Sequence, residues 1–111
     1  MDETPLPFER ISPENMRHMF NEGKFWERAQ SGELTAVVER SRHPSLPLAM
    51  EPFCTQSQQV SYYDQNGNEV ARVHQYLRPN GSIGASGKPD PKRIFKDGKL
   101  YRLQKAQHDA H

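Results

Sequence analysis

The 111-residue chain is poor in several features, and each shortage removes a class of protein. A single cysteine, Cys54, excludes a framework of internal disulfides. No N-terminal apolar run has the length of a signal peptide or a membrane span. Together these absences favour a reducing compartment, so we expect a cytoplasmic protein. The length of 111 residues predicts one domain, and a hydrophobic fraction of only 33% predicts a modest core.

Metal-binding and cofactor motifs are also missing from the sequence. The histidines show no H-x-x-x-H spacing, and no C-x-x-C pair is possible with one cysteine. We therefore expect no metal site and no cofactor, since His108, Asp109 and His111 would hold a divalent ion only weakly. We expect Cys54 to be a half-buried structural thiol, with His43 as the nearest candidate base if the thiol were a nucleophile.

The stretch GSIGASGKPDPKR, residues 81–93, has the composition of a phosphate-binding loop but not its spacing. A P-loop has four residues between its first glycine and the Gly-Lys pair, then Ser or Thr. Here five residues separate Gly81 from Gly87, and Lys88 is followed by Pro89. The prolines also remove the free N–H groups that bind phosphate at a helix start. We interpret the stretch as a long connection between two hairpins.

Periodicity predicts an α+β fold with its helix first. We expect an extended arm over residues 1–11, a single domain over residues 12–105 and a flexible tail over residues 106–111. Ser12 is a suitable N-cap and Pro13 suits the first helical position. Apolar residues then recur at helical spacing as far as Gly32, with a kink or break expected near Gly23 because glycine weakens a helix interior.

Two β-hairpins account for the second half of the chain. Asn66-Gly67 favours a type I′ turn that places Val60 opposite Val73 on the core side of the sheet. Asp97-Gly98 predicts a second hairpin. The helix is therefore expected to pack on an antiparallel sheet of about four or five strands built from these hairpins. Which face it covers stays open: if it packs on the other face, Tyr63, Val70 and Tyr76 become core and His74 becomes an interior histidine.

Charge is unevenly distributed along the chain although the net charge is only +1. Residues 1–33 carry four cations and seven acids, whereas residues 88–105 carry seven cations and two acids. A basic end of this kind suggests a polyanionic partner or pairing between the two ends. The residues expected to bind a partner are Lys88, Lys92, Arg93, Lys96, Lys99 and Arg102.

These observations favour a small non-enzymatic binding protein, with an accessory or inhibitory role such as phage and mobile-element proteins have. Its basic hairpin and Gly/Pro-rich loop would engage nucleic acid or a protein that handles nucleic acid. A homodimer formed through exposed aromatic residues or a free strand edge is also open. No membrane partner is expected.

The alternative interpretation is a metal-independent ribonuclease. The non-core face of the first hairpin carries Arg72, His74 and Tyr76, which could supply a phosphate clamp, a base or acid, and a proton donor. Lys92 or Arg93 would assist them. Small ribonucleases of the barnase and RelE type place such groups on an antiparallel sheet below N-terminal helices, and the layout predicted here is similar at the level of architecture. An enzyme would need these groups to converge in one cleft.

Overall fold

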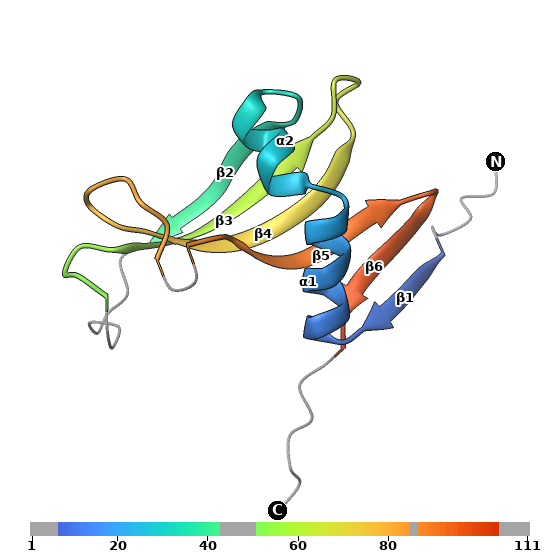
Figure 1. Cartoon of the computed structure of the whole chain (residues 1–111), viewed down its shortest axis with the longest axis horizontal. Coiled ribbons are helices and arrows are strands. Elements are labelled where there is room, and N and C mark those ends of the chain that lie inside the picture. The colour runs from blue at the N-terminus through green and yellow to red at the C-terminus, as the bar shows by residue number, and fades with distance from the viewer. Residues whose placement is uncertain (1–6, 43–50, 85–86, 105–111) are drawn as a thin grey trace, which may run out of the picture.

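The computed structural model describes residues 7–42, 51–84 and 87–104, which form two helices and a six-stranded sheet. The helices are α1 (Pro13–Glu22) and α2 (Phe25–Ser31). The strands are β1 (Phe8–Ile11), β2 (Thr35–Arg42), β3 (Gln56–Tyr63), β4 (Glu69–Leu77), β5 (Asp90–Lys96) and β6 (Lys99–Leu103). Their spatial order is β1-β6-β5-β4-β3-β2, and both helices lie on one side of the sheet (Figure 1). The predicted α+β class is confirmed.

The predicted sheet was wrong in strand number and in strand direction. It has six strands, and it is mixed because β1 runs parallel to β6. Phe8 lies opposite Leu100 and Ile11 lies opposite Leu103, so part of the expected N-terminal arm belongs to the sheet. A parallel pairing between two ends of a chain has no connecting turn to mark it in the sequence. The predicted tail, residues 106–111, lies outside the described residues.

The helical segment begins and breaks where the sequence predicts. The Ser12 hydroxyl accepts a hydrogen bond from the Asn15 N–H at 3.1 Å, which caps α1. The break follows Gly23, where a Cβ atom would lie 2.5 Å from the ring of Phe25. Since Phe25 stacks on Phe20 with ring centroids 5.6 Å apart, the break turns a second aromatic ring into the core.

The predicted registers of both hairpins are largely confirmed. Val60 lies opposite Val73, and Ser57, Gln59 and Ser61 lie opposite Tyr76, His74 and Arg72 in that order. Asp97 and Gly98 both have positive φ, as a type I′ turn requires.

The turn at Asn66-Gly67 is not type I′, since Gly67 has positive φ and Asn66 does not. The Asp64 carboxylate accepts hydrogen bonds from the N–H groups of Asn66 and Asn68, both at 2.9 Å. A longer turn satisfies that side chain, and the resulting shift places Tyr63 opposite Glu69, whereas a two-residue turn at Asn66-Gly67 would place Tyr63 opposite Val70.

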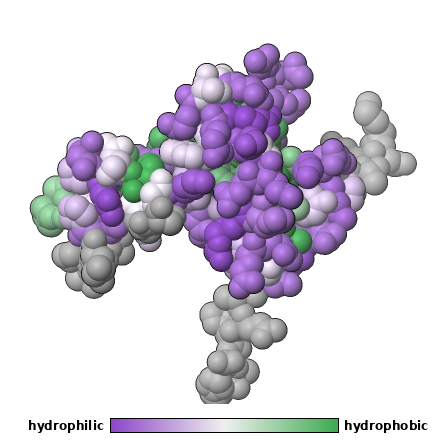
Figure 2. Space-filling view, in the orientation of Figure 1, coloured by the Kyte–Doolittle hydropathy of each residue, from purple (hydrophilic) through white to green (hydrophobic). Residues whose placement is uncertain are grey.

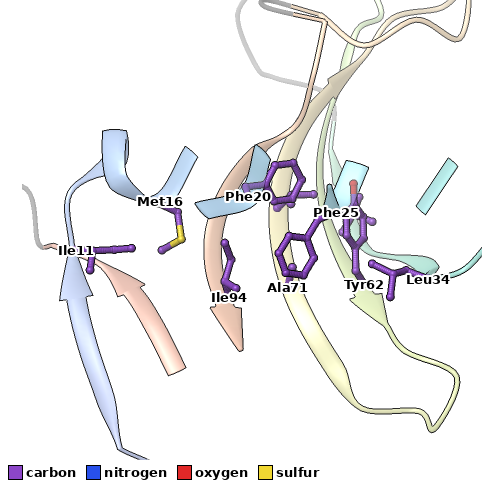
Figure 3. Packing of buried hydrophobic residues seen from close by; sticks show 10 residues of the cluster. Ile11, Met16, Phe20, Phe25, Leu34, Tyr62, Ala71 and Ile94 are labelled. Carbon is purple, nitrogen blue, oxygen red and sulfur yellow. The ribbon is translucent and has the colours of Figure 1, made fainter. Parts of the chain in front are cut away.

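The core lies between the helices and one face of the sheet. Figure 3 shows its side chains running from β1 across to β3, with the two phenylalanine rings near the centre. The buried apolar residues are Ile11, Met16, Phe20, Phe25, Leu34, Val60, Tyr62, Ala71, Val73 and Ile94. On the helix side, the outward surface is mostly hydrophilic (Figure 2). No described helix covers the opposite face, which we call the helix-free face.

Candidate functional site

Four arginines form a row across the helix-free face. Arg10 on β1 lies opposite Arg102 on β6, which lies opposite Arg93 on β5, which lies opposite Arg72 on β4. Partners in neighbouring strands project from the same face, and neighbouring strands lie about 4.8 Å apart. This arginine row therefore spans about 14 Å.

Only part of the charge in the arginine row is compensated by the protein. Glu69 accepts hydrogen bonds from Arg72 at 3.1 Å and from Arg93 at 2.9 Å, so one carboxylate serves two guanidinium groups. Arg102 is exposed and has no carboxylate partner among the described residues, and Arg10 donates only to the Leu103 carbonyl oxygen, at 3.1 Å. The Nε atom of Arg93 is buried, and no described residue accepts a hydrogen bond from it. The row therefore retains unused capacity to bind anions.

Aromatic rings flank the arginine row on the same face. Phe8 and Phe95 both lie opposite Leu100, and Phe8 is 54% exposed. The Arg10 guanidinium lies 5.7 Å from the ring centroid of Phe8, and that of Arg93 lies 5.8 Å from Phe95. Planar cations beside partly exposed rings are the groups on which nucleic-acid bases stack.

A pocket of about 800 Å³ opens where β4 and β5 separate. The pairing of these strands ends at His74 and Asp90, and the connecting segment returns to β4 through a hydrogen bond from the Gly84 N–H to the Tyr76 carbonyl oxygen. The residues that line the pocket are Arg17, Gln59, Arg72, His74, Gln75, Tyr76, Gly84, Lys88, Pro89, Asp90 and Lys92. The pocket therefore brings together the three residues of the ribonuclease hypothesis and a lysine of the second hairpin.

His74 contacts two neighbouring side chains in this pocket. Its Nε2 atom lies 2.7 Å from the Ser57 hydroxyl, and its ring meets Tyr76 edge-on with centroids 4.7 Å apart. Burial lowers the pKa of His74 below its ordinary value, the charge of Lys92 lowers it further, and Asp90 opposes them. The imidazole is therefore neutral near pH 7 and can accept a proton.

The cations predicted to bind a partner do not share one surface. Arg93 and Arg102 lie in the arginine row, and Lys88 and Lys92 line the pocket. The remaining two, Lys96 and Lys99, lie at the far end of the hairpin. Strand alternation sends them to the helix side, where Lys99 bonds to Glu9 at 2.7 Å.

The two lysines of the pocket are also paired. Lys92 lies 2.8 Å from Asp90, and Lys88 lies 3.9 Å from Glu27. Both pairs are about half exposed, so an incoming anion can compete for the lysines.

Sequence reasoning missed half of the arginine row and two further basic residues. Arg10 was not predicted because the pairing of β1 has no local signal, and Arg72 was considered only for catalysis. Arg40 and Arg42 lie opposite Gln59 and Ser57 on the helix-free face. A bulge after Val38 places them there, whereas uninterrupted alternation would have put them on the helix side.

The remaining sites considered from the sequence offer little. Cys54 is exposed rather than half-buried, and its φ is 74° because it sits in the tight turn that leads into β3. Within residues 7–42, 51–84 and 87–104, no three potential metal ligands gather. His43, His108, Asp109 and His111 lie outside these ranges. None of the helices seen in these ranges is long and apolar enough to span a membrane.

No family model, curated protein or solved structure matches the chain.

Proposed function

We propose that this protein is a nucleic-acid-binding domain that holds a single strand on its helix-free face. The observation that carries the proposal is the arginine row, Arg10-Arg102-Arg93-Arg72, on a face without a described helix. The backbone phosphates of the strand would contact the guanidinium groups, which bind phosphate with two parallel hydrogen bonds. The sequence-based prediction of a nucleic-acid partner is kept, but the proposed surface changes from the basic hairpin with its Gly/Pro-rich loop to the helix-free face, which includes Arg93 and Arg102 of that hairpin.

The electrostatics of the free protein support an anionic partner. Like charges placed directly opposite each other destabilise a sheet, by up to about 1 kcal/mol for each pair. Here three consecutive opposite pairs are Arg–Arg, and Glu69 compensates only two of the four arginines. Such an arrangement costs stability in the free protein and is relieved when phosphates bind.

The aromatic residues favour a single strand over a duplex. Phe8 and Phe95 lie beside the arginines, and Tyr76 lies further along the same face at the pocket. Bases of a single strand are free to stack on such rings, and this stacking requires no particular sequence. Bases inside a duplex are already stacked on one another and are not available to the rings.

The proposal is tested by fluorescence anisotropy of labelled single-stranded RNA and DNA at several salt concentrations. We expect binding that weakens as salt increases and that is reduced in an Arg93→Gln, Arg102→Gln variant. A Lys96→Gln, Lys99→Gln variant loses the same charge from the helix side of the same hairpin and should bind nearly as the wild type does. Salt-independent binding, or equal losses in the two variants, would refute the proposal. Failure to bind any nucleic acid would leave a protein that handles nucleic acid as the partner to seek.

A second candidate function, metal-independent RNA cleavage, is favoured by the contents of the pocket. The neutral imidazole of His74 could accept the proton of a ribose 2′-hydroxyl while Lys92 neutralises the phosphate. Tyr76 could protonate the leaving oxygen. Arg72, however, bonds through its Nε atom to Glu69 and would have to exchange that partner to hold the phosphate.

Gel analysis of the RNA recovered from the binding experiment separates the two functions. Cleavage that disappears in a His74→Ala variant would establish the ribonuclease. If the RNA stays intact with the wild-type protein, RNA cleavage is excluded and nucleic-acid binding remains the proposed function.

A further inference from the structure

We infer that two copies of the chain pair through β2, antiparallel and around a two-fold axis at Val37, so that their sheets join. No described strand pairs with the outer edge of β2, and all eight residues of that strand are exposed. An unpaired edge presents free N–H and C=O groups to another strand. Val37 and Val38 are 40% and 51% exposed on this edge, which is a large apolar exposure for adjacent residues.

The side chains of β2 are complementary to those of a second β2 in this arrangement. Val37 lies opposite Val37 of the second copy, and Ala36 lies opposite Val38 of the second copy. No like charges oppose each other in this central stretch. Ala36 and Val38 also line a pocket of about 400 Å³ with Trp26 on the helix side, so the added valine packs next to an apolar surface.

The charges at the two ends of the strand favour the antiparallel pairing. Glu33 precedes β2, and Arg40 and Arg42 end it. The bulge after Val38 shifts the register of the rest of β2 by one residue, so Arg42 of one copy lies opposite Glu33 of the other. A parallel pairing would instead set acid beside acid and arginine beside arginine. Glu33 already contacts Arg28 at 2.5 Å and is half exposed, so it can serve both cations.

This axis also aligns the two arginine rows. Val37 lies opposite Ser61, and Ser61 lies opposite Arg72, so Val37 is level with the arginine row. A two-fold axis through Val37 places the rows of the two copies at the same level of a twelve-stranded sheet, in line with each other and separated by the β3 and β2 strands of both copies. With strands about 4.8 Å apart, the joined face is about 53 Å from one Arg10 to the other. This consequence rests on the proposed function, whereas the pairing itself does not.

Cysteine cross-linking tests the pairing. In a Cys54→Ser background, Val37→Cys places two thiols directly opposite each other, within the Cα separation of about 4.4–6.8 Å that a disulfide accepts. Val38→Cys is the matched control, because its two copies would be offset by two residues and lie about 8 Å apart, beyond disulfide reach. We expect mild oxidation to cross-link the Val37→Cys variant and not the Val38→Cys variant. Equal cross-linking of both variants, or none of either, would overturn the inference.

Sedimentation of the wild-type chain provides the independent measurement. We expect a monomer–dimer equilibrium that Val37→Lys shifts to monomer, because the substitution opposes two cations at the axis. A wild-type chain that stays monomeric at all concentrations would also overturn the inference. Nucleic-acid binding by the Val37→Lys monomer would show that the proposed function survives without the pairing. We expect that monomer to occupy half the length of strand per complex.

Discussion

Removing the two uncompensated arginines should change the salt dependence of single-strand binding by a calculable amount. For a single strand, the slope of log affinity against log salt is about −0.7 for each neutralised phosphate. Four arginines therefore predict a slope of about −2.8, and a fourfold increase in salt should weaken binding by about 50-fold. With Arg10 and Arg102 both changed to glutamine, the slope should fall to about −1.4 and the same salt change should cost about 7-fold.

The assay is fluorescence anisotropy of one labelled oligonucleotide, repeated at four or more salt concentrations. The matched control is Lys24→Gln, Lys96→Gln, which removes the same charge from exposed positions off the arginine row. We expect this control to keep the wild-type slope. Thermal unfolding should show both variants folded, since Arg102 has no ion pair among the described residues and Arg10 donates a single exposed hydrogen bond. The reasoning is refuted if the slope is unchanged in the arginine variant or falls equally in the control.

Three further predictions concern stability and pH. Glu69→Gln should lower the free energy of unfolding in urea by about 1–2 kcal/mol, because Arg72 and Arg93 lose their shared carboxylate. The same substitution should strengthen nucleic-acid binding. Weaker binding would show that Glu69 does not compete with phosphate. Phe20→Ala should cost about 3–5 kcal/mol in the same assay, because this 2% exposed ring packs against Phe25 and Tyr62, and a loss near zero would contradict the described core. His74 has a folded-state pKa below its ordinary value of 6.5, so its contribution to stability is full above pH 6.5 and is lost as the pH falls through the lower, folded-state pKa. In a His74→Gln variant, the free energy of unfolding should depend less on pH in that acidic range. An unchanged pH profile would contradict the burial of the ring.

Local signals in the sequence predicted the helix start, the break and both hairpins. Ser12 and Pro13 mark the start of α1, and the turn residues fix which side chains share each face. These features depend on residues close together in the chain. Val60 and Val73, which are apolar where their opposite-face neighbours are polar, favoured the core face that the structure shows, but they did not decide which face the helix covers.

Features that depend on distant contacts could not be predicted in the same way. The parallel pairing of β1 with β6 brings Arg10 level with Arg102, and no spacing in the sequence specifies that register. The bulge in β2 moves Arg40 from one face to the other without a glycine or proline to mark it. The alignment of the four arginines could therefore not be predicted from the sequence, although two of them were predicted to bind a partner. In the same way, the cations of the second hairpin lie close together in the sequence, but strand alternation places them on opposite faces of the sheet.

The most direct test of the central claim is an NMR titration of isotope-labelled protein with a single-stranded oligonucleotide, observing the Nε–H signals of the arginines. The account predicts that the signals of Arg10, Arg93 and Arg102 shift together with the backbone amides of β1, β6, β5 and β4. It also predicts that the amides of α1 and α2 shift little. Shifts concentrated on the two helices, or arginine signals that do not move while the oligonucleotide binds, would contradict the assignment of the helix-free face as the binding surface.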